Sequence, residues 1–166
     1  RVIGSDIEIR GEEHVARLHD TQGARIIFIA NESGWGDIPI FTHALRSCRL
    51  GGLVKNLTCV YNRDVFESSV ISGLVGHATT VIKPIRSDGS EEACKMTLRG
   101  GLYQLGHGPL VVFPEESPTE QAAFELDAIR PSVISELREY IEINGDPDIA
   151  TDKIFIVPVG MVGSSY

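Results

Sequence analysis

The chain has 166 residues, of which 42% are hydrophobic and 23% charged, and its net charge at pH 7 is −8. This length and composition predict one globular domain over residues 1–166. The acidic balance excludes nucleic acid as a partner and excludes attachment to anionic lipid by charge alone, because both need clustered Lys and Arg. From the opening Arg1 and the end at Tyr166 we expect a fragment of a longer chain.

The apolar runs of the sequence predict an alternation of strands and helices. Runs rich in Ile, Val and Thr predict buried strands at 25–30, 55–61, 79–85, 109–113 and 153–159, and an alternating stretch at 2–9 predicts an edge strand. Mixed segments between them predict helices at 39–49, 64–73, 90–105 and 131–143. This order favours an α/β fold with a mainly parallel central sheet covered by helices on both faces.

Two further features bear on packing and location. In the third predicted helix, Ala93, Met96, Thr97, Gly100 and Gly101 form one face of small residues. Cys48, Cys59 and Cys94 are an odd number without metal-ligand spacing, which predicts reduced core thiols in the cytoplasm. No apolar run approaches the roughly 20 residues that cross a bilayer, so any membrane contact is expected to be peripheral and to come from segments of the longer chain.

Two acidic loops directly follow predicted core strands. Loop 31–37 follows the first core strand and loop 114–120 follows the strand at 109–113. Ligands of parallel sheets usually bind at the carboxyl ends of the strands. If the two loops adjoin, they gather one group of carboxylates in a cleft: Glu32, Asp37, Glu115 and Glu116.

The same loops carry a family resemblance. "FIANESGWGDIPIF" resembles the first motif of the glycerolipid (lysophospholipid) acyltransferase superfamily, which reads Asn-His, four residues, Asp, then an apolar helix. "GPLVVFPEESPTE" resembles the third motif, Phe-Pro-Glu-Gly-Thr-Arg, and "IFIVPVG" resembles the fourth. Gly76 and Arg86 lie where the family has a glycine and the arginine of its second motif. The resemblance spans about residues 10–163 and implies a glycerol-3-phosphate acyltransferase-like fold.

The resemblance also implies an activity and roles for residues. The family transfers an acyl group from acyl-CoA or acyl carrier protein to a lipid-type hydroxyl and uses no other cofactor. Its histidine is the general base, and the Asp of the same motif, here Asp37, orients it. The resemblance implies that Arg86 and the third motif bind the acceptor head group. In this chain the third motif comprises Phe113, Pro114, Glu115 and Glu116. Residues 157–160 support the site.

The departures from the family pattern affect catalysis directly. Glu32 occupies the position of the catalytic histidine, Glu116 that of a glycine, and Pro118 that of the arginine that contacts acceptor phosphate. Free Glu has a pKa of about 4.3 and free His one of about 6.5, so an unperturbed Glu is a weak base at neutral pH. The negative charge of Asp37 would stabilise a protonated histidine at position 32, but it would repel a glutamate there. We expect the activity to be impaired or altered, and any acceptor to be neutral or cationic.

Other interpretations of these residues stay open. The domain is either a degenerate acyltransferase, a non-catalytic module that binds lipid, acyl-CoA or a protein partner, or a transferase that uses Glu32 as its base. An oxygen-ligand site for Mg²⁺ or Ca²⁺ at Glu32, Asp37 and Glu115, or a two-carboxylate glycosidase, lacks a supporting motif. Asp37 is also placed to cap the following helix. None of the five histidines is an obvious replacement for the missing base; His43, six residues beyond Asp37, stays open as a candidate although it lies roughly on the wrong face of the predicted helix.

Overall fold

The computed structural model describes residues 8–31, 37–48, 50–62, 81–85, 91–114, 131–144 and 153–161. The predicted helix at 64–73 and most of the predicted strand at 2–9 lie outside them, and residues 8 and 9 are not in a strand. The described part forms a five-stranded sheet in the order β3-β2-β4-β1-β5. Every pair of neighbouring strands is parallel. The α/β class and the parallel sheet predicted from the sequence are thereby confirmed.

The strands coincide closely with the predicted apolar runs. They are β1 (Ala24–Ala30), β2 (Thr58–Asn62), β3 (Val81–Ile85), β4 (Leu110–Val112) and β5 (Lys153–Val159). The two outer strands, β3 and β5, contain Pro84 and Pro158. Proline has no N–H to donate to a ladder, so it is tolerated in strands that pair on one side only. The sequence of each edge strand therefore fits its place in the sheet.

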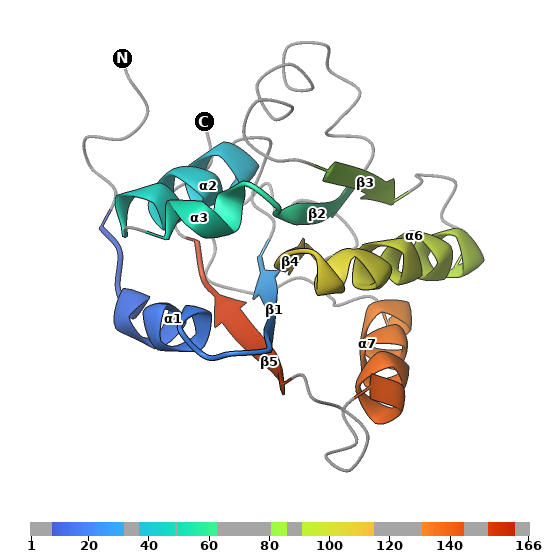
Figure 1. Cartoon of the computed structure of the whole chain (residues 1–166). Coiled ribbons are helices and arrows are strands. Elements are labelled where there is room, and N and C mark those ends of the chain that lie inside the picture. The colour runs from blue at the N-terminus through green and yellow to red at the C-terminus, as the bar shows by residue number, and fades with distance from the viewer. Residues whose placement is uncertain are drawn as a thin grey trace.

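Helices pack against both faces of the sheet (Figure 1). They are α1 (Glu12–His19), α2 (Asp37–Ser47), α3 (Gly51–Val54), α6 (Glu91–Tyr103), the 3₁₀ turn η1 (Gln104–Gly106) and α7 (Pro131–Asn144). The first three cover the face that bears Ile26, Phe28 and Ala30 of β1. The face that bears Ile27 of β1, with Val112 of β4, is covered by α6 and α7. The predicted coverage of both faces is confirmed.

The face that α6 presents to the sheet includes only part of the predicted face of small residues. Cys94, Leu98, Gly101 and Leu102 are buried, whereas Met96 is 61% exposed. A Cβ on Gly101 would lie 2.8 Å from Val60 Cγ2 and 3.2 Å from Leu110 Cδ1. Gly101 thus lets the helix approach β2 and β4 closely, whereas Met96 of the predicted small-residue face points to solvent and Thr97 and Gly100 are half-buried.

Candidate active site

The site lies at the carboxyl edge of three neighbouring strands. In the parallel register, Ile29 of β1 is opposite Val112 of β4, and Ala30 of β1 is opposite Val159 of β5. The segments that follow these strands therefore begin side by side at one edge of the sheet. Three of the four motif regions named above, which are far apart in the sequence, start from this edge.

The helices that follow two of these strands in the described part of the chain pack on opposite faces of the sheet. After β1 the chain enters α2, whose Ile38, Phe41 and Leu45 pack on one face of the sheet. After β4 the next described element is α7, whose Val133 and Leu137 pack on the other face. Adjacent strands with diverging connections create a crevice outside their carboxyl ends, and this crevice is the usual ligand position in open α/β sheets. The arrangement favours a ligand between the ends of β1 and β4.

Asp37 is the predicted catalytic residue that the structure places. It is the first residue of α2 and its exposed fraction is 0%. The helix thus begins two residues before the predicted start at Pro39. A carboxylate in the first turn is stabilised by the positive end of the helix dipole. This position suits a residue that holds another group in place rather than one that exchanges protons with solvent.

The other predicted site residues divide into two groups. Phe113 is 1% exposed and belongs to the core cluster that includes Ala30 and Ile38. Pro114 is also buried. These two residues are buried in the core directly before the second acidic loop. Their substrate-binding role stays a prediction. The remaining predicted residues lie outside the described part of the chain: Glu32, Arg86, Glu115 and Glu116.

Asn31 is a residue at this edge that was not predicted to act there. Its side-chain Nδ2 donates to the backbone oxygen of Met161 at 2.9 Å, and the backbone N–H of Met161 donates to Asn31 Oδ1 at 2.6 Å. The carboxamide thereby continues the β1–β5 pairing beyond the strand ends. The available signal was its place in the first motif, which in the family begins with asparagine.

The fourth motif forms the strand on the outer side of the site. Val157 and Val159 of β5 pack against the core cluster on the α2 face. Gly160 is exposed and follows the strand directly. This placement agrees with a supporting position beside β1.

Comparisons with known proteins add no family. In the described part of the chain, no helix is both long enough and apolar enough to span a membrane. No protein-family model matches the sequence, and no curated protein is significantly similar to it.

Proposed function

We propose that this chain is an acyltransferase-type domain whose catalytic position is altered by Glu32. It would transfer an acyl group from acyl-CoA or acyl carrier protein to a lipid-type hydroxyl. The observation that carries the proposal is the adjacency of the carboxyl ends of β4, β1 and β5. A family site built from the first, third and fourth motifs needs these three ends together.

The reaction defines what each residue would do. The acceptor oxygen attacks the thioester carbonyl carbon, the C–S bond breaks, and the thiol of the carrier leaves. A base takes the proton of the hydroxyl as it attacks, which contributes about 10² to 10⁴ in rate. Asp37, enclosed at the start of α2, is suited to orient an imidazole at position 32. A glutamate there can accept the proton only if its surroundings raise its pKa.

A non-catalytic binding module is the second candidate. The observation that favours it is the enclosure of Asp37, whose carboxylate stabilises the first turn of α2 whether or not a base is present. The fold and an acyl-binding surface would then persist after the base has been replaced. In this case the domain would bind acyl-CoA or lipid without turnover.

One set of variants separates the two candidates. Acyl-CoA turnover is measured with a panel of neutral, cationic and phosphate-bearing hydroxyl acceptors for the unmodified chain, E32Q and E32H. If Glu32 is a working base, the unmodified chain is active and E32Q loses about 10²-fold or more. If the domain is an altered transferase that lacks only its base, transfer appears in E32H and falls again in E32H/D37N.

A control variant removes a carboxylate outside the proposed site. E13Q, an exposed carboxylate on α1, removes one negative charge away from the proposed site and should leave every rate unchanged. Acyl-CoA binding without turnover in any variant supports the binding module. Neither turnover nor acyl-CoA binding in the unmodified chain and in E32H contradicts both candidates.

A further inference from the structure

A hollow of about 270 Å³ lies at the opposite edge of the sheet, where β1 and β4 begin. Its polar lining includes His19, Arg25 and His107, and its apolar lining includes Ile26, Leu53 and Leu105. None of its lining residues, all of which belong to the described ranges, is Asp or Glu. The exposed Asp20 directly follows His19 in the chain but is not a lining residue. We call it the amino-edge pocket.

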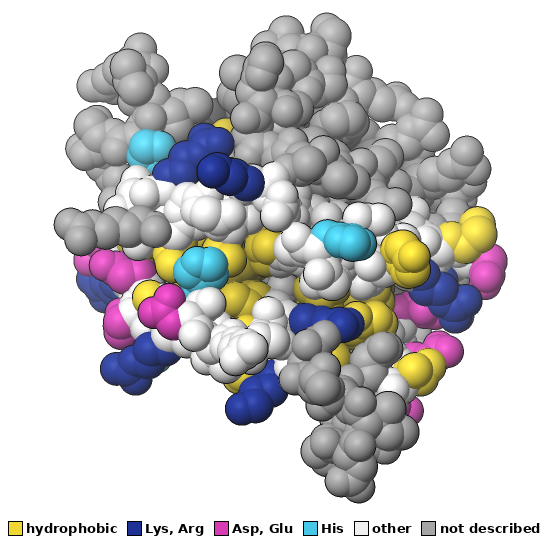
Figure 2. All heavy atoms as spheres, viewed as in Figure 1, with side chains coloured by type: hydrophobic (Ala, Val, Ile, Leu, Met, Phe, Trp, Pro, Cys, Tyr) yellow, Lys and Arg dark blue, Asp and Glu magenta, His cyan; other side chains and the backbone are white. Residues whose placement is uncertain are grey.

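Figure 2 shows the face of the molecule on which histidine side chains lie at either side of hydrophobic side chains that reach the surface. His19 is the last residue of α1, and His107 directly follows η1. Both are exposed, and within the described part of the chain neither imidazole takes part in a hydrogen bond or ion pair. Both rings are therefore available to a ligand.

The segments that follow the two histidines are held in place. The segment before β1 is held by backbone hydrogen bonds, and the segment before β4 by close packing. Before β1, the N–H of Ala24 donates to Thr21 O at 3.1 Å, and the N–H of Lys153 donates to Gly23 O at 3.0 Å. Before β4, a Cβ on Gly108 would lie 2.2 Å from Asn56 O, so only glycine permits this approach. A pocket whose walls are already fixed binds a ligand without a further cost of ordering them.

We infer that the amino-edge pocket binds a small molecule bearing a phosphate or carboxylate group. The anionic group lies between the imidazoles of His19 and His107, and its apolar part covers Ile26, Leu53 and Leu105. Arg25 also lines the pocket, while its Nη1 donates to Tyr140 Oη of α7 at 3.0 Å. This inference does not depend on the proposed acyl transfer, because it concerns the other edge of the sheet.

The test is an NMR titration of the whole chain with inorganic phosphate and, separately, with butyrate. We expect saturable shifts of the Gly23 and Gly108 amide signals. H19N and H107N should each weaken binding by about fourfold or more, because the shorter asparagine amide withdraws one hydrogen bond from the anion. H14N removes an exposed histidine on the same helix that does not line the pocket, and should change the affinity by less than about twofold.

Several results would overturn the inference. These are the absence of saturable shifts with both anions up to about 50 mM, or equal affinities in H19N, H107N and the unmodified chain. Binding of Zn²⁺ at these rings without binding of either anion also contradicts it. If the anions bind, their relative affinities tell a phosphate ligand from a carboxylate ligand with an apolar tail.

Discussion

Asn31 and Met161 are joined by two hydrogen bonds, although they are separated by almost the whole sheet-forming part of the chain. The side chain of Asn31 donates at 2.9 Å and accepts at 2.6 Å, and both of its bonds go to the backbone of Met161. The pairing fixes the end of β5 to the end of β1 next to the proposed site. It resembles one more step of the strand ladder, made by a side chain.

Replacing Asn31 should therefore loosen this edge of the sheet. N31A removes both bonds and leaves the half-buried backbone of Met161 without these partners, so we expect a loss of about 1–3 kcal/mol in the free energy of unfolding. N31D keeps an acceptor for the N–H but places a carboxylate against the carbonyl oxygen, and it should also destabilise. Urea unfolding measures both. N56A, a change of an exposed asparagine, is the control, and an N31A chain as stable as N56A would contradict the structure here.

Gly101 offers a second test, of the contact between α6 and the sheet. G101A places a methyl group 2.8 Å from Val60 Cγ2, and overpacking of a tight core costs about 1–3 kcal/mol. Alanine would otherwise gain up to about 1 kcal/mol over glycine inside a helix. G52A in α3 meets nothing within 4 Å and should be neutral or stabilising. Thermal unfolding of the two variants should move in opposite directions, and a stabilising G101A would show that the contact is looser than described.

The strands were predictable because each is a short run rich in β-branched and apolar residues. The helices were less so. α1 was missed because none of its described residues is buried, so the sequence Glu12-Glu13-His14 carries no strong apolar stripe. α3 was missed because Gly51-Gly52 is typical of a turn, whereas in the structure Leu53 and Val54 are buried and hold the short helix in place. α1 is held by the partly buried Val15, Ala16 and Leu18, which pack against the core, and α3 by its two buried residues, so in both cases tertiary packing outweighs the local preference.

The location of the candidate site was predictable from the sequence, but its details were not. Parallel strands place all their carboxyl ends at one edge, so the two acidic loops were expected to start together. The sequence does not specify that β4 lies beside β1 rather than at an edge, because the order of strands depends on which faces the helices cover. The Asn31–Met161 pairing depends on that order and on register, and neither leaves a local pattern in the sequence.

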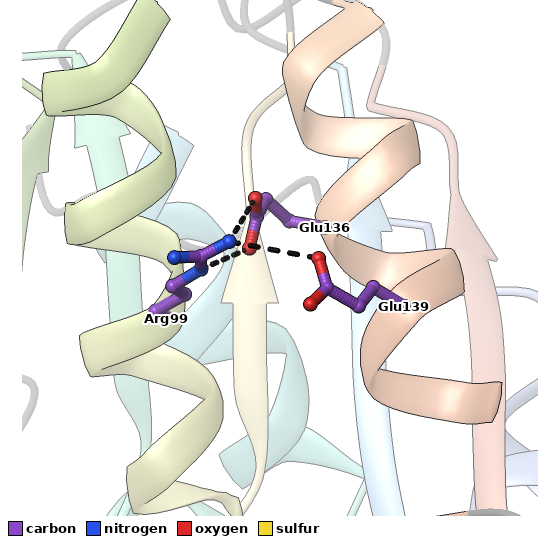
Figure 3. A network of polar contacts seen from close by, with 3 residues as sticks. All are labelled: Arg99, Glu136 and Glu139. Atoms are coloured by element: carbon purple, nitrogen blue, oxygen red, sulfur yellow. Dashed lines mark hydrogen bonds and ion pairs between the residues drawn. The ribbon is translucent and has the colours of Figure 1, made fainter. Parts of the chain in front are cut away.

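Arg99 joins α6 to α7 through two glutamates (Figure 3). Its Nε donates to Glu136 Oε2 at 2.6 Å and its Nη2 to Glu136 Oε1 at 3.0 Å, while Glu139 Oε2 lies 3.5 Å from Nη2. The side chain of Glu136 is only 5% exposed, whereas that of Glu139 is 57% exposed. The hydrogen bonds to Glu136, followed by its negative charge, raise the pKa of Arg99 above its ordinary value.

The two glutamates should differ sharply in their effect on stability. R99M leaves the buried carboxylate of Glu136 without this partner and should lower the urea midpoint, because an uncompensated buried charge is strongly unfavourable. R99M/E136M removes both charges and should recover part of the loss. E139Q changes an exposed pair and should lie within about 0.5 kcal/mol of the unmodified chain. An R99M chain that unfolds at the same midpoint as E139Q would show that the bidentate pair contributes nothing measurable.

Cys48, directly after α2, provides a prediction that depends on pH. Burial, and then the negative charge of Glu12, raise the pKa of its thiol above the ordinary value. The folded chain thus holds this proton more tightly than the unfolded chain does. The resulting stabilisation is complete below the unfolded pKa of the thiol and is lost as pH rises through the folded one.

Because the thiolate is the reactive form, alkylation of Cys48 by iodoacetamide at pH 8 should be slower than that of a free cysteine. E12Q should increase the rate and move the midpoint of the rate–pH curve to lower pH. E13Q, on the same turn of α1, should leave that midpoint in place, since Glu13 is paired with His14 at 3.3 Å and is not among the causes of the shift. Mass spectrometry identifies the modified residue, because Cys59 and Cys94 are buried and react only when the chain unfolds. Identical curves for E12Q and E13Q would show that the charge of Glu12 does not act on this thiol.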